Sequence, residues 1–335
     1  MIKIAVVGTG GWGINHVRAF ARARDVQLVA VADRAEGAVN RAGGFAPAAR
    51  KLRDLDEVLA LPEVDAVVLA TPADRHAMHA QQVLAAGKHV FVEKPLALSS
   101  ADAEQVVAAA ERAKRTLMVG HIMLYHPVVE RMKAMIKSGE LGWLLYLYAV
   151  RVNLGTVRRD ENALWSLGPH DASILLHLLD DQPQTVSARG GAYLQKNIHD
   201  VVFVNLQFKS GVMAQIQLSW LDPRKERRVT VVGSRKMLEF DDVHPVEKLR
   251  IYDKGVERPP AFSEFSEFLS IRNGDIHIPQ VPLAEPLELE CRHFIECLNA
   301  NRRPLSDGSS GLQVVRILEA AQRSLVDNGV PVPIS

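Results

Sequence analysis

The tripeptide Glu93-Lys94-Pro95 is the first group in this sequence whose types and position suggest chemistry. It directly follows the apolar run 88–92, which is typical of a buried strand, and ligands bind at the carboxyl ends of such strands in open α/β sheets. Thr71-Pro72 ends the preceding apolar run at the matching position, so two loops face one crevice. An ammonium there can hydrogen-bond a substrate oxygen, and burial lowers the pKa of an amine toward the range that suits proton transfer. A solvated lysine at a strand end is the alternative interpretation.

A second group, Gly8-Thr9-Gly10-Gly11-Trp12-Gly13, matches the pattern G-x-G-x-x-G and lies between the apolar run Ile2–Val7 and a helical pattern from Ile14. In such a loop the first glycine makes the turn, the second lets the backbone approach a pyrophosphate, and the third lets helix and strand pack closely. Asp33 follows Gly13 by 20 residues, at the end of the next strand, where a carboxylate accepts hydrogen bonds from ribose hydroxyls. The group predicts a dinucleotide site. A glycine-rich turn with Asp33 as a helix cap is the alternative.

The choice between the two nicotinamide cofactors depends on Asp33 and its neighbour. The carboxylate of Asp33 would repel a 2′-phosphate, which favours NAD. Arg34 argues in the other direction, because an adjacent guanidinium can hold a phosphate. We therefore predict NAD as the cofactor and NADP as the second choice.

Both groups require a scaffold that brings strand ends together, and the first 120 residues supply one. Short continuous apolar runs alternate there with helical patterns, as in parallel strands that are connected by helices. The predicted strands are Ile2–Val7, Gln27–Ala32, Asp65–Ala70, Lys88–Val92 and Leu117–Val119. The predicted helices are Ile14–Ala23, Leu55–Leu61, Arg75–Ala86 and Ala101–Lys114. The fold class is therefore α/β, with a Rossmann-type, doubly wound parallel sheet that binds NAD(P) in residues 1–122.

The regular alternation of strand and helix patterns ends after about residue 122, and residues 123–335 form a second predicted domain. Its predicted helices are Pro127–Gly139, Pro169–Leu179, Leu287–Ala300 and Gly311–Asp327. Its predicted strands are Leu144–Val152, Thr185–Tyr193, Val201–Phe208, Val212–Trp220, Arg228–Val232 and Met237–Phe240. The stretch Pro259–Pro286 lacks a clear period and predicts a long loop. This pattern predicts an α+β domain with a mostly antiparallel sheet, suited to substrate binding and oligomerisation.

Composition limits the classes of function that need to be considered. The 335 residues carry 40 Lys and Arg against 39 Asp and Glu, a net charge of +1, which argues against a nucleic-acid groove. The apolar runs are far shorter than a membrane crossing requires, and a strand pattern from Ile2 leaves no room for a signal peptide, so we expect a cytoplasmic protein that does not bind membranes. Cys291 and Cys297 have no second pair, and the histidines do not complete a ligand set, so no metal site is expected.

Taken together, the motifs resemble the Gfo/Idh/MocA family of oxidoreductases over essentially the whole chain. The signatures are the glycine loop, Ala70-Thr71-Pro72 with His76, Gly87-Lys88-His89-Val90 leading into Glu93-Lys94-Pro95, Gly120 followed by Pro127, Gly168-Pro169-His170, and Asn301-Arg302-Arg303-Pro304 with Asp307-Gly308. The resemblance implies that Lys94 and His170 lie beside the substrate carbon that exchanges hydride with the nicotinamide. It also implies a cis peptide bond between Lys94 and Pro95, and it places His76 and His121 beside the cofactor.

The chain departs from the family pattern around the motif histidine. Ser166 and Ser173 stand where the family commonly has aspartates, and Asp171 is adjacent to His170. The run 158–171 resembles members from nucleotide-sugar and surface-polysaccharide pathways, and its candidate substrate-binding residues are Arg158, Asn162, Trp165, His170 and Asp171, together with Lys94. Its paired arginines, Arg158 and Arg159, suit a diphosphate or a carboxylate, which guanidinium groups bind bidentately. A solvated charge run on a loop is the alternative.

These residues predict an NAD-dependent dehydrogenase that acts on a secondary hydroxyl of a sugar, a cyclitol or a nucleotide sugar. His170 is the candidate base and Lys94 the electrostatic partner, although the two roles can be exchanged. Two alternatives remain at this point: a catalytically silent, cofactor-binding sensor or assembly protein, and a sugar oxidoreductase that retains its cofactor. No motif specifies the hydroxyl or the direction of the reaction.

The resemblance further implies a homodimer or a homotetramer. In the predicted strand Val201–Phe208, a semi-polar face of alternating residues opposes an apolar face that suits packing on helices. Family members commonly pair through this sheet.

Overall fold

The computed structural model describes residues 1–257, 270–282 and 284–334. The chain divides into two compact units, the first comprising Met1–His126 and Ala284–Glu319, the second Pro127–Leu283 and Ala320–Ser335. The sequence places a boundary at residue 122, four residues before the end of the first of these ranges, and it gives no sign that residues 284–319 return to the first unit. The reason is that an amphipathic helix shows the same period whichever core it covers.

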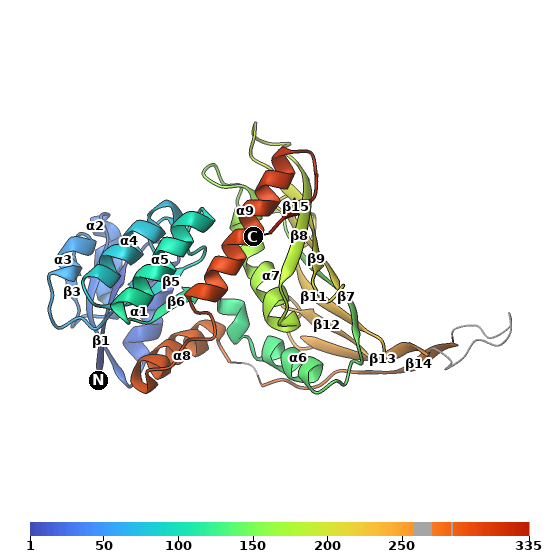
Figure 1. The fold of residues 1–335 in the computed structure, drawn as a ribbon. Coiled ribbons are helices and arrows are strands. Elements are labelled where there is room, and N and C mark those ends of the chain that lie inside the picture. Colours follow the sequence, from blue (N-terminus) through green and yellow to red (C-terminus); the bar gives the residue numbers. More distant parts are fainter. Residues whose placement is uncertain (258–269, 283, 335) are drawn as a thin grey trace. The chain divides into compact units, whose positions relative to one another are not determined.

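The first unit is a six-stranded sheet with helices on both faces (Figure 1). Its strands are β1 (Ile2–Val7), β2 (Val26–Ala32), β3 (Arg50–Leu52), β4 (Ala66–Leu69), β5 (His89–Glu93) and β6 (Leu117–Gly120). Its helices are α1 (Gly13–Arg22), α2 (Glu36–Phe45), α3 (Leu55–Leu59), α4 (Ala73–Ala85), α5 (Ser100–Ala113), the 3-10 turn η1 (Ile122–Tyr125), α8 (Pro286–Ala300) and most of α9 (Gly308–Val326).

All pairings in this sheet are parallel, and the order β3-β2-β1-β4-β5-β6 is that of a Rossmann fold. The direction of winding reverses between β1 and β4, so their carboxyl ends open a crevice. Strands β1, β4, β5 and β6 are almost completely buried, as expected when helices cover both faces, whereas the edge strand β3 is largely exposed. On one face, Phe20 of α1, Phe91 of β5 and Phe294 of α8 belong to a single buried cluster. The predicted doubly wound parallel sheet is therefore confirmed.

The second unit contains a nine-stranded mixed sheet in the order β14-β13-β12-β11-β7-β10-β9-β8-β15. Its strands are β7 (Leu144–Val152), β8 (Pro183–Gly191), β9 (Val201–Phe208), β10 (Met213–Ser219), β11 (Glu226–Gly233), β12 (Met237–Asp241), β13 (Leu249–Glu257), β14 (Ser270–His277) and β15 (Val332–Pro333). Its helices are α6 (Pro127–Lys137), α7 (Ala163–Leu179) and the end of α9. Among the strand pairings of the described residues in this sheet, only that of β7 with β10 is parallel, so the prediction of a mostly antiparallel sheet is confirmed.

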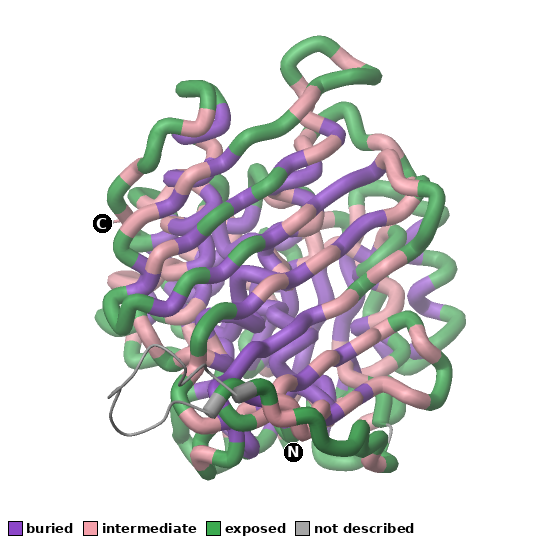
Figure 2. Tube along the Cα trace, turned by 90° about the vertical axis from the view of Figure 1, so that its right-hand side faces the viewer, coloured by how far each residue is buried: buried purple, intermediate pink, exposed green. Residues whose placement is uncertain are grey.

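The two faces of this sheet differ as the alternation in the sequence predicts. In β9, Val202, Val204, Leu206 and Phe208 are buried, and α7 packs on this face against β7, β9 and β10. The opposite face, which we call the outer sheet face, is half-exposed along its central strands, and Figure 2 shows this alternation of burial along successive strands. Its exposed apolar side chains include Tyr146, Phe203 and Met213.

Some predicted elements need correction. The predicted loop Pro259–Pro286 is wrong over Ser270–His277, which form β14, whereas residues 259–269 and 283 lie outside the described residues. β14 escaped prediction because it is an edge strand that pairs with β13 alone, and its isoleucines Ile271 and Ile276 are exposed, so no alternation marks it. The elements α2, β3, β13 and β15 were not predicted either.

Sequence analysis predicts a protein that does not cross a membrane. Among the helices of the described residues, none combines the length and the apolar character that such a crossing needs.

Candidate active site

The glycine loop connects β1 to α1 at the reversal point of the first sheet. Gly8 has φ of +86°, and a Cβ there would lie 2.5 Å from the carbonyl oxygen of Ala70, which follows β4. A Cβ on Gly13 would overlap the carbonyl of Gly8. Beside Gly10 and Gly11, by contrast, a Cβ would meet open space. Two glycines therefore serve close packing, and two leave the backbone accessible to a phosphate group.

The N-terminus of α1 is available to an anion. Its N-cap residue, Trp12, makes no side-chain capping hydrogen bond, and the first turn contains no acidic residue. By comparison, α5 and α3 are capped by Ser99 and Asp54. Because the first amides of a helix bind negative charge when they are not capped, the loop and α1 fit the pyrophosphate of a dinucleotide.

Asp33 lies next to this loop, at the end of β2. Its Oδ2 accepts a hydrogen bond from the backbone N–H of Thr9 at 2.7 Å, and its Oδ1 accepts one from the backbone N–H of Ala35 at 2.9 Å. The half-buried carboxylate is thereby fixed beside the loop, with lone pairs left for ribose hydroxyls. Arg34 is exposed. The residues present thus fit NAD at the position predicted.

The loops after β4 and β5 are joined by His76 of α4. This side chain is buried, with Nδ1 2.7 Å from the carbonyl oxygen of Pro95 and Nε2 2.8 Å from that of Thr71. The Lys94-Pro95 peptide bond is cis, as the resemblance implies. His76 therefore contacts both strand-end loops at once, and the half-buried Lys94 lies between the end of β5 and this contact.

Glu93, predicted to bind the cofactor, is engaged within the protein. Its Oε1 accepts a hydrogen bond from the indole N–H of Trp12 at 2.6 Å and lies 2.6 Å from Nε2 of His16, while its Oε2 accepts one from the backbone N–H of Lys94 at 3.1 Å. Burial raises the pKa of Glu93, but the hydrogen bond and charge of His16, with the bond from Trp12 and the charge of Lys94, outweigh burial and lower it. The carboxylate is therefore ionised, and it connects the glycine loop to Lys94.

His121, another predicted cofactor residue, follows β6 and is buried. Burial lowers its pKa to about 4, with Glu93 opposing and Lys94 reinforcing that shift, so the imidazole is neutral at pH 7. Neither of its ring nitrogens has a hydrogen-bond partner in the described part of the chain. An unsatisfied buried imidazole beside Glu93 and Lys94 fits a site that takes a polar ligand.

In the second unit, His170 lies on α7, and the prediction for this helix requires correction. The sequence predicts a start at Pro169, but α7 begins at Ala163, because the side chain of Asn162 accepts a hydrogen bond from the N–H of Trp165 at 3.1 Å and caps it. Pro169 is thus inside the helix, and the half-buried His170 follows it. The amide of Asn162 also donates to Gln322 at 2.8 Å, which gives this predicted substrate residue a structural function.

Asp171 is completely buried and forms a bidentate ion pair with Arg151 of β7. Nε and Nη2 of Arg151 donate to Oδ2 and Oδ1 of Asp171 at 2.7 and 3.0 Å. Burial lowers the pKa of Arg151, but the charge and hydrogen bonds of Asp171 outweigh this effect and raise it. The structure therefore places this predicted substrate residue in an internal contact. The exposed Arg158 pairs with Glu161 at 3.0 Å, and Arg159 is exposed as well.

The structure groups the predicted residues by unit. Within the first unit it brings the glycine loop, Asp33, Thr71-Pro72, His76, Lys94 and His121 to the carboxyl ends of the strands. Within the second unit it places Asn162, Trp165 and His170 on one helix and its cap, with Arg158 just before. Sequence reasoning missed His16 and Arg151. His16 gave no signal, whereas Arg151 did: a charged residue at an inward position of an alternating strand requires a buried partner.

Two family models match the chain. One, described as an oxidoreductase family with an NAD-binding Rossmann fold, matches residues 2–121, and a GFO/IDH/MocA C-terminal domain matches residues 129–239. Inositol 2-dehydrogenase 2 from Saccharopolyspora erythraea is 32% identical over 276 residues, which cover 79% of each chain. Inositol 2-dehydrogenase from Rhizobium meliloti is 26% identical, with 97% of each chain covered. The crystal structure of GenD2 from gentamicin A biosynthesis, in complex with NAD, aligns with a TM-score of 0.84 and 26% identity, covering all of this chain and 96% of that chain.

Proposed function

Because the chain belongs to the NAD-binding Gfo/Idh/MocA family of oxidoreductases, we propose that it oxidises or reduces a secondary alcohol position on a polyhydroxylated ring. Sugars, cyclitols and nucleotide sugars are the substrate classes. The inositol dehydrogenases among its relatives support a ring of this kind. The observation that carries the proposal is the connection between Lys94 and the cofactor loop: Glu93 accepts hydrogen bonds from Trp12 of that loop and from the N–H of Lys94.

The residues of this chain divide the work in the proposed reaction. The glycine loop and the N-terminus of α1 hold the pyrophosphate, and Asp33 holds the adenosine ribose. When bound, NAD supplies the acceptor for hydride. His170 removes the hydroxyl proton, and the ammonium of Lys94 stabilises the developing alkoxide; the reverse assignment of these two roles gives the same overall chemistry. Trp165 and the guanidinium of Arg158 complete the proposed substrate-binding set of the second unit.

A panel of inositols, free sugars and nucleotide sugars, screened with NAD by thermal shift, tests the substrate class because selective binding stabilises the folded protein. Compounds that stabilise are then assayed for NADH formation. Lys94→Met and His170→Ala should each lower turnover by ~10²-fold or more while NAD binding is retained, because each removes a group that moves a proton or balances charge. Lys137→Met, at an exposed position of α6, is the control and should be unchanged.

The outcomes separate the alternatives. NADH formed with any compound on the panel excludes a silent sensor, whereas tight NAD binding with no turnover on the whole panel would favour it. Reduction of cofactor that stays with the protein identifies an enzyme that retains it. Turnover close to that of the unchanged protein in Lys94→Met or His170→Ala contradicts the assigned roles.

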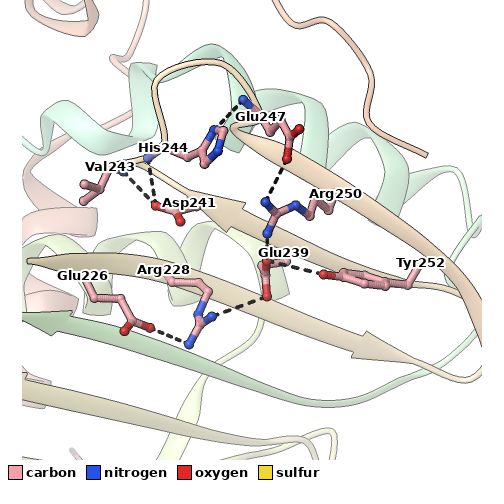
Figure 3. Close-up of polar contacts among 9 residues, drawn as sticks. All are labelled: Glu226, Arg228, Glu239, Asp241, Val243, His244, Glu247, Arg250 and Tyr252. Carbon is pink, nitrogen blue, oxygen red and sulfur yellow. Dashed lines mark hydrogen bonds and ion pairs between the residues drawn. The ribbon is translucent and has the colours of Figure 1, made fainter. Parts of the chain in front are cut away.

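We also propose that two copies of the chain pair through the outer sheet face. Its central strands expose Tyr146, Phe203 and Met213, and beside them an ionic network surrounds Glu239 (Figure 3). That network consists of Glu226, Arg228, Glu239, Glu247, Arg250 and Tyr252. A face with an apolar centre and charges of both signs suits a second copy of itself, since a two-fold axis can bring each charge to its opposite.

Light scattering tests this pairing. The unchanged protein should be a dimer or a tetramer at micromolar concentration. Phe203→Glu should shift it toward monomer, since a buried and unpaired carboxylate would oppose association. Val326→Glu changes an exposed apolar residue at the end of α9, away from this face, and should leave the assembly unchanged. A monomeric unchanged protein contradicts the proposal.

A further inference from the structure

Residues from α1, from the loop after β5 and from β6 lie around the buried carboxylate of Glu93. Trp12 and His16 contact it from the start of α1, and the N–H of Lys94 contacts it from the loop after β5. Gly120 of β6 pairs with Glu93 in the sheet, and a Cβ there would lie 3.0 Å from its Cδ and Oε2. A glycine at position 120 therefore leaves space for a charged group.

The other ring nitrogen of His16 lies near α8, which carries a second buried acid, Glu290. Nδ1 of His16 lies 3.8 Å from the thiol sulfur of Cys291. Next to Cys291 is Glu290, which is fully buried and has no hydrogen-bond partner for either oxygen among the described residues. Burial raises the pKa of Glu290 well above its ordinary value, and the charge of Glu93 raises it further. Burial therefore favours the neutral form of Glu290, whereas the contacts of Glu93 favour its charged form.

The structure gives Glu93 several contacts that favour its ionised form and gives Glu290 none. An ionised carboxylate needs donors when it is buried, and Trp12, His16 and the N–H of Lys94 supply them. The charge of Lys94 lowers the pKa of Glu93. Since an interaction between two charges is reciprocal, the anion at position 93 must equally favour the ammonium form of Lys94.

We propose that Glu93 is a positioning residue whose buried anion, held by Trp12 and His16, ties the glycine loop to the backbone of Lys94 and keeps the Lys94 side chain in its ammonium form. This inference deepens the proposed function and rests on it, because it concerns the lysine assigned to the reaction. The other titratable groups that interact with the Glu93 carboxylate are His16, His121, Glu290 and Cys291. Both Glu93 and Lys94 influence the pKa of His121.

Two amide substitutions test the charge directly. Glu93→Gln and Glu290→Gln each replace a buried carboxyl with an amide of the same size. The first does so where the contacts favour the charged form, and the second where burial favours the neutral form. The titration of Lys94 is followed by NMR of protein labelled with 13Cε-lysine, in which the Lys94 signal is assigned by its absence from Lys94→Met. This readout needs no turnover, so it stands even if no substrate is found.

In Glu93→Gln the midpoint of the Lys94 titration should fall by about one pH unit, the usual effect of losing an opposite charge nearby. In Glu290→Gln it should stay within about a fifth of that shift. Equal shifts in both variants, or none in Glu93→Gln, overturn the proposal. If the dehydrogenase assignment alone is wrong, the titration shift persists although no compound of the panel yields NADH.

Trp12→Phe provides a second test that survives if Glu93→Gln does not fold. Trp12 is 46% exposed, so the fold tolerates its replacement, and the change removes one donor while keeping the anion. With one donor fewer, the negative charge of Glu93 is less well balanced and stabilises the Lys94 ammonium more strongly. The midpoint of the Lys94 titration should therefore rise, whereas in Glu93→Gln it should fall. If activity is found, its pH profile should move in the same directions. A shift of Trp12→Phe to lower pH, or no shift, contradicts the proposal.

Discussion

The ion pair between Arg151 and Asp171 permits a prediction that separates two functions of Asp171. Sequence analysis assigns this aspartate to the substrate, whereas the structure pairs it bidentately with Arg151 in the interior of the second unit. The side chains of the two residues are 8% and 1% exposed. Removing one partner leaves the other charge buried, whereas removing both leaves none.

The expected magnitudes follow from that burial. Asp171→Asn keeps one acceptor but leaves the guanidinium uncompensated, and we expect a loss of about 3 kcal/mol in the free energy of unfolding. Asp171→Leu keeps no acceptor and should lose about 4–5 kcal/mol. The double variant Arg151→Met, Asp171→Leu replaces the pair by apolar side chains of similar volume, and it should recover most of that loss. The cycle should therefore give a coupling of about 3 kcal/mol or more.

Urea unfolding followed by circular dichroism measures these values, with Arg158→Met as a control that removes a guanidinium from an exposed pair. That control should change stability by less than about 1 kcal/mol. If Asp171→Asn costs no more than the control, the buried pair does not stabilise the unit and the reasoning fails. If the double variant recovers stability but has lost substrate binding, Asp171 contacts the substrate as the sequence predicts.

Three further predictions concern the first unit. In Gly120→Ala the new Cβ would press on Glu93, so we expect a loss of about 1–3 kcal/mol in stability on urea unfolding and a change in tryptophan fluorescence as the bond to the indole is lost. In the folded protein His121 has a pKa of about 4, whereas an unfolded histidine binds a proton below about pH 6.5. Because the unfolded chain binds this proton first, the free energy of unfolding should fall by about 3 kcal/mol as the pH decreases from 6.5 to 4. His121→Phe should remove that part of the pH dependence; an unchanged slope contradicts the assignment. Asp33→Ser should lower the Michaelis constant for NADP relative to that for NAD by about 10-fold or more, and adding Arg34→Ala should cancel the gain, since the guanidinium is the group that holds the phosphate.

Sequence reasoning identified best those strands that are buried on both faces or fully buried on one face. β1 and β9 have the predicted bounds because a doubly buried strand is continuously apolar and a half-buried strand alternates. The edge strands β3, β14 and β15 were missed because they bury little and leave no pattern. The predicted start of α7 at Pro169 is wrong for a different reason: Asn162, seven residues earlier, has the side chain that caps the helix.

The candidate site was predictable where a local motif sets the chemistry and unpredictable where distant elements meet. The glycine loop and Asp33 follow from their spacing, because the turn and the strand end fix their positions. Lys94 follows from its place after a strand together with the family resemblance. The contact of His16 with Glu93 joins residues that are 77 positions apart, and that of Asp171 with Arg151 joins residues 20 apart on a helix and a strand. A single sequence does not specify which faces of two elements meet, so these partners required the structure.

Both proposed catalytic side chains are adjacent in sequence to a buried acid that a base on another element holds. Glu93 precedes Lys94 and is held by His16 of α1, while Asp171 follows His170 and is held by Arg151 of β7. In each unit the buried acid is held in one direction by its partner. Because neighbouring residues on a strand end or a helix point in different directions, the half-buried side chain of the proposed catalytic residue points away from the buried acid. A carboxylate that is buried and paired cannot rotate without losing its donors, so each pair restrains the backbone that carries the reactive group. Restraint of this kind is what hydride transfer requires, because small displacements of the reacting groups lower the rate steeply.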